Sequence, residues 1–478
     1  MERKPSRNVL DWMGISDAPD WTVARPLGRL VSLLLALLFA GALVAAFVLI
    51  GRTIVGEGGA GSMLGTGALI VALLGAPFLI WSTVLKHETV RYQKEGHITD
   101  RITSAVEQLG AEKTVKKDGV ETTEPNIEVR IGAVLSLERI AQDSTDYDKG
   151  RDHVLVMEIL CAYVRQNAPA SEATDTMRKR WEDAKQRWNS PQEQFEEFFC
   201  RDNGINPPDA SDYITLEHAR HEIRNFRPPR ADIAQALLVL GRRTAEQRRV
   251  EAAWPDPPNK NTKWVFDIPC PKLPDIEDGT ARDPAKIRAF QKDLADWKET
   301  LFTYSGYRLN LQSSNLQRAD LSAKRPDRSD AVFSGALMQG ARMEGSSLID
   351  ARMEGANLNE AQMELATLWF ARMEGANLMD ARMEGAGLID TRMEGVNLSN
   401  ARVDKTTGWT GVLLHNAAVP SVDFRETTIS KEQIKTTFGD GSTKLPDTIP
   451  RPAHWPDAEL DLFSFHTQYK KWLTNPDT

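Results

Sequence analysis

The segment Ala331–Val403 reads, in groups of five, AVFSG ALMQG ARMEG SSLID ARMEG ANLNE AQMEL ATLWF ARMEG ANLMD ARMEG AGLID TRMEG VNLSN ARV. Phe, Met, Leu or Val occupies the third position of every group. An α-helix needs an apolar period near 3.6 residues and a strand needs a period of two, so a period of five fits neither. A repeat that cannot bury its apolar side alone has to stack on its neighbours, and the segment therefore predicts a solenoid.

This pattern resembles the pentapeptide-repeat family, whose motif is a small residue, a polar residue, a central Leu, Phe or Met, and two polar residues. The resemblance implies a right-handed quadrilateral β-solenoid with one repeat per side and about twenty residues per coil. Weaker repeats centred on Leu311, Leu316 and Leu321 precede the run, and the intervening KRPDRSD (residues 324–330) predicts a loop at one corner. With coils about 4.8 Å apart, the rod is expected to be about 20 Å long, with no room for a cavity.

The central residues are expected to point inward and to fill the axis of the solenoid. They are Phe333, Met338, Met343, Leu348, Met353, Leu358, Met363, Leu368, Met373, Leu378, Met383, Leu388, Met393, Leu398 and Val403. Regularly spaced methionines can indicate copper or redox chemistry, but an unbranched, polarizable side chain also fills gaps in a narrow core. We interpret these methionines as structural.

Residues twenty apart are expected to lie above one another on one side of the solenoid. Two opposite sides then carry columns of Arg beside columns of Glu: Arg342, Arg382 and Arg402 with Glu344, Glu364 and Glu384, and Arg352, Arg372 and Arg392 with Glu354, Glu374 and Glu394. We interpret these columns as surface salt-bridge ladders, whose individual pairs contribute little to stability. On a third side, Asn357, Asn377 and Asn397 are spaced to form an amide ladder.

The fourth side carries an outward apolar column of Ile349, Trp369 and Ile389, with Phe370 beside Trp369. These four are the candidate partner-binding residues, because an exposed apolar stripe usually has a cover. One cover is the C-terminal tail of the same chain, which contains Trp455, Leu460, Phe463, Phe465, Tyr469 and Trp472. The other is a protein partner or a second copy of the chain, and the sequence leaves both open.

Two charge-free apolar runs, Leu30–Ile50 and Leu64–Leu85, are each long enough to cross a bilayer. The short connection between them predicts a hairpin. Basic residues lie outside the hairpin at Arg25, Arg29, Lys86, Arg91 and Lys94, whereas the connection contains Arg52 alone. The positive-inside rule then places both termini in the cytoplasm, with the chain crossing the membrane twice. A cleaved signal peptide is the alternative for the first run, but a second run follows it promptly.

Between these runs and the repeats the chain is predicted to be helical. One apolar face is formed by Ile127, Ile131, Val134, Leu135 and Ala141, and the next by Val154, Met157, Cys161 and Val164. Paired helices of this kind resemble armadillo or HEAT units. The stretches EPNIEVRIGAVLSLERIAQDS, RDHVLVMEILCAYVRQNAP and PPRADIAQALLVLGRR also resemble a segment found between membrane spans and pentapeptide repeats in bacterial proteins. This resemblance to bacterial proteins implies that the membrane is a bacterial inner membrane. A short helix after a Pro-rich linker is expected to cap the open end of the solenoid.

The predicted organisation is therefore multidomain. It consists of a cytoplasmic N-terminal segment (1–28), a two-helix transmembrane hairpin (29–86), an all-α helical-repeat-like module (87–250), a Pro-rich linker (251–284), a capping helix (285–300), the pentapeptide-repeat solenoid (301–425) and a short C-terminal tail (426–478).

Few motifs in the chain carry chemistry. Gly56, Gly58 and Gly61 match GxGxxG, but they lie between the apolar runs with no βαβ context, so no nucleotide site is predicted. His218 and His221 lack a third ligand, which favours an exposed helix face over a metal site. The widely spaced cysteines, Cys161, Cys200 and Cys270, predict neither a disulfide framework nor a zinc site. No catalytic, cofactor-binding or metal-binding residue is predicted, and the net charge of −8 gives no reason to expect nucleic-acid binding.

Three functions follow from these features. The leading prediction is a non-enzymatic, membrane-tethered scaffold that presents the solenoid to a cytoplasmic protein partner. The second is a membrane sensor or effector in stress or phage defence, in which the hairpin forms homo-oligomers. The third comes from the resemblance, because some soluble pentapeptide-repeat proteins imitate DNA and inhibit topoisomerases. Ala331–Val403 carries ten acidic residues against six Arg, and the Arg columns interrupt any phosphate-like array, so mimicry is the least favoured.

Overall fold

The computed structural model describes residues 98–188, 192–203, 215–274, 284–327 and 329–474, together with seven single positions between residues 40 and 55. The predicted hairpin (29–86) lies almost wholly outside these residues, as do the N-terminal segment (1–28) and the GxGxxG motif. Within the described ranges, no helix is both long enough and apolar enough to cross a membrane. The chain forms two compact units, Met1–Thr99 and Asp100–Thr478. The second unit contains the helical module, the solenoid and the tail.

Three helices form the centre of the helical module: α4 (Ile127–Tyr147), α5 (His153–Asn167) and α10 (Ala231–Gly241). The Asn126 side chain accepts a hydrogen bond from the Val129 N–H and so caps the first turn of α4. The helical pair is confirmed, because Val134, Leu137 and Ile140 of α4 are buried against the other two helices. Leu135, which was assigned to the same face, is instead 42% exposed. A capping box of Thr244 and Gln247 begins α11 (Ala245–Ala253).

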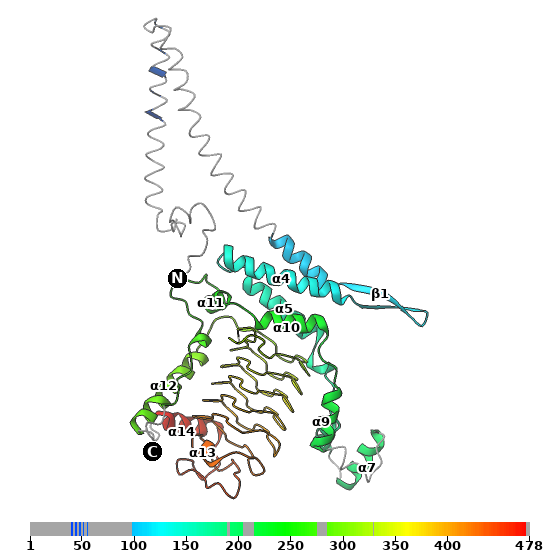
Figure 1. Cartoon of the computed structure of the whole chain (residues 1–478), viewed down its shortest axis with the longest axis vertical. Coiled ribbons are helices and arrows are strands. Elements are labelled where there is room, and N and C mark those ends of the chain that lie inside the picture. The colour runs from blue at the N-terminus through cyan, green and yellow to red at the C-terminus, as the bar shows by residue number, and fades with distance from the viewer. Residues whose placement is uncertain are drawn as a thin grey trace. The chain divides into compact units, whose positions relative to one another are not determined.

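A β-hairpin interrupts the module that was predicted to be all-α, so that prediction is wrong at this point. Strands β1 (Glu112–Lys117) and β2 (Val120–Pro125) pair antiparallel and project from the helices (Figure 1). Asp118 and Gly119 form the turn with φ of 51° and 84°. Asp-Gly is a strong signal for this two-residue turn. The strands carry charged and Thr side chains that are mostly exposed, so the hydrophobic alternation of an ordinary strand is absent.

The remaining elements lie beside the solenoid or at its far end. They are η1 (Ala170–Glu172), α6 (Met177–Arg187), α7 (Gln192–Asp202), α9 (Leu216–Asn225), η3 (Val265–Asp267), α12 (Pro284–Phe302), α13 (Lys431–Ile434) and α14 (Leu462–Thr474). Residues 98–109 are also helical.

The repeats form the predicted β-solenoid. Parallel bridges join positions twenty residues apart, for example Arg352 with Arg372 and Arg372 with Arg392, and four such bridges occur in each coil. The central residues from Met338 to Leu398 are 0% exposed and fill the axis. The structural interpretation of the methionines agrees with this burial.

The twenty-residue register is interrupted at three insertions, the last of which makes Asp423 pair with Lys444, twenty-one residues on. Asn310 pairs with Leu337, twenty-seven residues on, because the predicted KRPDRSD loop adds seven residues to the first coil. Gly387 pairs with Gly408, twenty-one residues on, after one residue is added in the turn that follows Arg402. Bridges then continue as far as Asp423 with Lys444, so the solenoid extends past residue 425, where the repeat pattern in the sequence fades.

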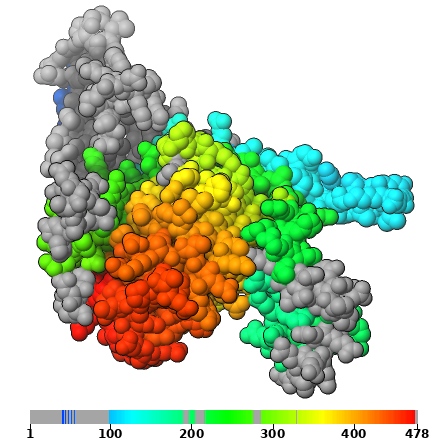
Figure 2. All heavy atoms as spheres, turned by 60° about the horizontal axis from the view of Figure 1, so that its bottom comes forward, coloured from blue at the N-terminus to red at the C-terminus, as the bar shows by residue number. Residues whose placement is uncertain are grey.

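Both ends of the solenoid are closed, but not by the helix that was expected to cap it. α12 lies along one side, where Leu301 packs over Gly355 and Gly375. The helical module closes the N-terminal end, where the Val332 N–H donates to the carbonyl of Gly241 at 2.9 Å. The tail closes the C-terminal end, shown in red in Figure 2. Its side chains Phe465, Tyr469 and Trp472 surround Phe438.

Candidate interaction surface on the solenoid

The four faces of the solenoid differ in what covers them. The first ladder face carries Glu344, Glu364 and Glu384 with Arg342, Arg382 and Arg402, and the second carries Glu354, Glu374 and Glu394 with Arg352, Arg372 and Arg392. The stripe face carries Ile349, Trp369 and Ile389, and the asparagine face carries Asn357, Asn377 and Asn397. Segments of the same chain cover both ladder faces.

The second ladder face lies under apolar side chains from η3 and α12. Phe266 packs over Gly335 and Gly355, and Leu301 over Gly355 and Gly375. Polar contacts join the same surfaces, since Arg352 donates to the carbonyl of Phe266 at 2.6 Å. This cover belongs to one buried hydrophobic cluster that includes Trp264, Phe290, Leu294 and Trp297.

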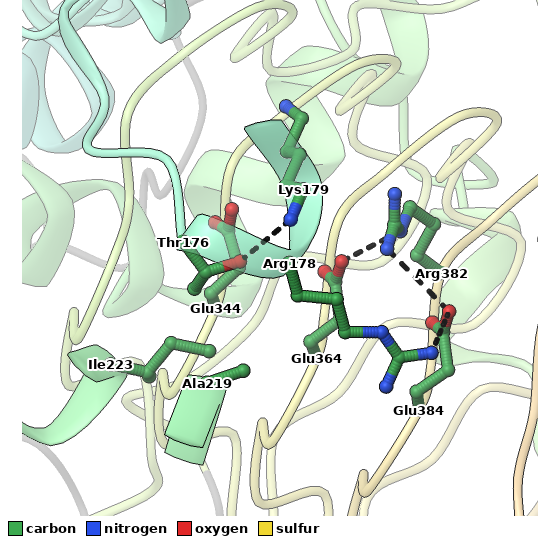
Figure 3. Close-up of a pocket in the computed structure, with 9 residues that line it drawn as sticks. All are labelled: Thr176, Arg178, Lys179, Ala219, Ile223, Glu344, Glu364, Arg382 and Glu384. Carbon is green, nitrogen blue, oxygen red and sulfur yellow. Dashed lines mark hydrogen bonds and ion pairs between the residues drawn. The ribbon is translucent and has the colours of Figure 1, made fainter. Parts of the chain in front are cut away.

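The first ladder face lies under α6 and α9, and α7, which packs on α6, lies farther from the coils (Figure 1). We call these three helices the arm. Its residue Glu182 pairs with Arg382 at 3.0 Å and with Arg402 at 3.1 Å. Asp175, just before α6, pairs with Arg342 at 2.8 Å. A small cavity remains between the arm and the solenoid (Figure 3). The centre of a water molecule can lie within about 10 Å³ of it, so the cavity has room for a single water.

The ladders are buried, so the prediction of surface salt bridges is wrong. The carboxylates of Glu354 and Glu374 are fully enclosed, because helices that the sequence could not place lie over them. Burial raises the pKa of Glu364, Glu374 and Glu384 to about 7, and the neighbouring guanidinium groups only partly oppose this effect. Removing one partner from a buried pair costs far more than it does at a surface.

The asparagine face forms the predicted amide ladder. The side-chain amide of Asn377 donates to the side-chain oxygen of Asn357 at 3.3 Å, and that of Asn397 donates to Asn377 at 3.0 Å. Such a ladder satisfies polar groups along an open face.

The stripe face presents an exposed aromatic pair. Trp369 is 41% exposed and Phe370 is 42% exposed, while Ile349 and Ile389 are partly buried. The tail does not cover this pair among the described residues, since its aromatic side chains pack around Phe438 instead. Of the two covers that the sequence left open, the described part of the tail is therefore not the one over Trp369 and Phe370.

Phe370 occupies an unfavourable backbone position at the corner of its coil. Its φ is 59°, in the left-handed region, and the equivalent corners of the adjacent coils carry Asp350 and Asp390. Bulky side chains are rare in this region, whereas Asp and Asn tolerate it. Phe370 is therefore a candidate functional residue, because folding alone would favour Asp here.

The candidate ligand residues do not converge on a metal site. His218 lies 3.9 Å from Glu222 of the same helix, and His221 lies beside Asn225. Within the ranges that the structure describes, no three His, Cys, Asp or Glu side chains are placed to hold a metal ion. Cys161, Cys200 and Cys270 are buried, and none of the three forms a disulfide.

Comparisons with known proteins agree with this geometry in the repeats. A family model described as pentapeptide repeats matches residues 329–364 and 361–400. The chain therefore carries a pentapeptide-repeat domain. In the structure this domain is part of a longer ladder that begins at Asn310 and ends at Lys444. A comparison with curated proteins found no match.

Several solved pentapeptide-repeat structures are similar to part of the chain. Rfr23 from the cyanobacterium Cyanothece 51142 is 25% identical over 21% of this chain and 63% of its own length, with a TM-score of 0.15. HetL from Nostoc sp. strain PCC 7120, involved in heterocyst differentiation regulation, is 21% identical over 32% of this chain and 77% of its own, with a TM-score of 0.16. QnrB1, a plasmid-mediated fluoroquinolone resistance protein, is 15% identical over 34% of this chain and 71% of its own length, with a TM-score of 0.15. The chain thus spans less than two thirds of Rfr23.

Proposed function

We propose that this protein is a non-enzymatic scaffold, tethered to a bacterial inner membrane by two spans, whose stripe face binds a protein partner in the cytoplasm. The apolar runs Leu30–Ile50 and Leu64–Leu85 and their basic flanks support the tether. The exposed pair Trp369 and Phe370 carries the proposal for the binding surface.

The composition of the stripe face supports a protein partner. Aromatic side chains dominate the energetic centres of protein interfaces, because they bury a large area with few rotatable bonds. Asp350 and Asp390 lie at the corners on either side of Phe370. The partner surface is therefore expected to be apolar at its centre and basic at its rim.

The double variant Trp369→Thr, Phe370→Asp tests the proposal without disturbing the fold. Asp already occupies both neighbouring corners, and Thr410 occupies the position of Trp369 two coils further on, so the solenoid is expected to keep its melting temperature. Crosslinking in native membranes, followed by purification, is expected to recover the specific partner at a yield lower by about tenfold or more, as for loss of an interface hot spot.

A matched control changes the opposite open face. Met379 follows the central Leu378 as Trp369 follows Leu368. Met379→Thr with Asp380→Asn is expected to leave the crosslinked partner unchanged, since Asn400 occupies the equivalent corner of the next coil. Sedimentation of the purified protein separates the two partner classes, because only a second copy of the chain would alter the mass. Equal crosslinking yields from the parent and the stripe variant would overturn the proposal.

A further inference from the structure

The two covered faces are held by different kinds of interaction. The second ladder face is closed by a hydrophobic cluster that contains Phe266, Trp297 and Leu301. Between the arm and the first ladder face, charged side chains line most of the cavity, and Ala219 and Ile223 are its apolar members. A hydrophobic cover is largely insensitive to pH, whereas an ionic cover depends on the protonation of its groups.

A few ion pairs connect the body of the arm to the solenoid. Glu182 contacts Arg382 and Arg402, which belong to two successive coils, and also lies 3.2 Å from Arg178 of α6. Arg178 reaches back to Glu384 at 4.0 Å. Glu182 is therefore the residue whose loss would weaken docking most.

The arm has a hydrophobic core that does not include the solenoid. The ring of Trp181 in α6 meets the rings of Phe195 and Phe199 in α7 at 4.8 and 4.9 Å between centroids. Such aromatic contacts hold the two helices together. The arm can thus move as a body without exposing this core, and an apolar side chain that it would uncover is Ile223 of α9, which is 3% exposed and packs over Gly345.

Both roots of the arm are fixed to the first coil. The Thr174 N–H donates to the Gln317 side chain at 3.0 Å, and the Gln317 amide donates back to the Thr174 carbonyl at 2.8 Å. At the other root, Arg318 donates to the carbonyl of Phe226 at 2.9 Å. The arm is therefore pinned beside Leu316, while its body lies over later coils.

The carboxylates beneath the arm are incompletely satisfied. Glu344, Glu364 and Glu384 are each less than a tenth exposed, and the Oε2 atom of each has no hydrogen-bond partner. Figure 3 shows these three side chains in a row under Arg178. An ionised carboxylate that is buried without full hydrogen bonding opposes the closed state.

We propose that the arm is a releasable cover, which the ion pairs of Asp175 and Glu182 hold on the first ladder face and which swings away about its two roots on the first coil. Release exposes alternating columns of Arg and Glu over three coils without unfolding the solenoid.

Loss of protons drives this release. The pKa of Glu364 and of Glu384 is about 7 under the arm, raised chiefly by burial from an ordinary value of 4.5. A carboxyl group whose pKa is raised in the closed state favours closure fully below its ordinary pKa and loses that effect as the pH rises through about 7. Although burial opposes it, Lys179 and Arg342 lower the pKa of Asp175, so its ion pair persists throughout this range.

Charged and titratable groups face the three carboxylates from each packed element. They are Arg342, Arg382, Arg402 and Asp404 from the solenoid, Asp175 from the segment before α6, Arg178, Lys179 and Glu182 from α6, and His218 and Glu222 from α9.

Electron-spin distance measurements on the full chain test the proposal. The native cysteines are buried, so labels are placed at Gln186→Cys on α6 and Lys405→Cys on the solenoid, both of which are exposed. We expect one short distance at about pH 6 and a second, longer distance that grows at about pH 8. An unchanged near-ultraviolet circular dichroism spectrum would show that the solenoid stays folded.

Two variants and a matched control test which groups hold the arm closed and which groups release it. Glu182→Gln is expected to raise the open fraction about tenfold at both pH values, because it removes the contacts to Arg382 and Arg402. The double variant Glu364→Gln, Glu384→Gln is expected to keep the arm closed at about pH 8, since neither of the two carboxyl groups with a pKa of about 7 can then ionise. Glu374→Gln makes the same kind of change on the second ladder face and is expected to leave the arm unaffected. One identical distance distribution for the parent and Glu182→Gln at both pH values would overturn the proposal.

Discussion

Replacing Arg243 with leucine is expected to lower the free energy of unfolding by about 3–5 kcal/mol at neutral pH. Arg243 and Glu251 have side chains that are 2% exposed, and their nearest atoms, Nε and Oε1, are 2.8 Å apart. The same carboxylate oxygen lies 2.9 Å from Nε2 of His153, which is 0% exposed. Leucine would leave this carboxylate buried with much less compensation.

The position of Arg243 makes the effect a global one. One of its terminal nitrogen atoms donates to the carbonyl of Val332 at 3.1 Å, and Val332 is the first bridged residue after the corner loop. The ion-pair group therefore joins the helical module to the N-terminal end of the solenoid. Loss of this contact uncovers a terminal coil, which is where a stacked repeat is least protected.

The loss of stability caused by Arg243→Leu is also expected to depend on pH. Burial opposes ionisation of Glu251, but Arg243 and His153 outweigh it and lower the pKa of this carboxyl below its ordinary 4.5. In the native protein the stabilisation is thus present above pH 4.5 and is lost as the pH falls through the lowered pKa. In the variant burial dominates, so the difference in stability from the parent is expected to shrink as Glu251 takes up a proton.

Urea denaturation of parent and variant at neutral pH and near pH 4.5 measures both effects. Arg242→Leu is the matched control, because Arg242 is the adjacent arginine and its pair with Glu138, at 2.6 Å, is partly exposed. This control is expected to cost no more than about 1 kcal/mol. Equal losses for the two variants would show that the buried group does not hold the module to the solenoid.

The sequence alone predicted which residues fill the axis of the solenoid, because burial there follows an unbroken period of five residues. Every side chain from Met338 to Leu398 at the third position faces inward as predicted. The prediction weakened where the period changed, since one added residue after Arg402 moves every later residue out of phase. The hairpin at Asp118 and Gly119 was missed although its turn signal was present, because its strands bury no apolar face.

What covers each face was harder to predict, since it depends on contacts between distant segments. One local signal existed: the second ladder face has glycine at four successive corners, Gly335, Gly355, Gly375 and Gly395. A side chain at Gly335 would place its Cβ 2.3 Å from the ring of Phe266. Glycine therefore serves both the left-handed turn and the close approach of a cover. No comparable signal identified Asp175 or Glu182 as residues that hold the arm.

Truncating Met383, which lies on the axis, is expected to lower the free energy of unfolding far more than truncating Met379, which lies at the surface of the adjacent side of the solenoid. Met383→Ala is expected to lower the free energy of unfolding by about 2–5 kcal/mol, because Met383 is fully buried and the coil cannot collapse around the cavity. Met379→Ala removes the same atoms from a partly exposed position and is expected to change stability by no more than about 0.5 kcal/mol.

Thermal or urea unfolding of the two variants measures this difference directly. The backbone bonds of the coil explain why it should be large, since Met383 donates its N–H to the carbonyl of Arg402 and accepts at its own carbonyl from Ala386. A cavity on the axis loosens both bonds and thus the contact with the next coil. In a stack where each coil touches only its neighbours, that loss is not shared with the rest of the molecule. Similar small losses for both variants would mean that the methionines do not hold the axis together.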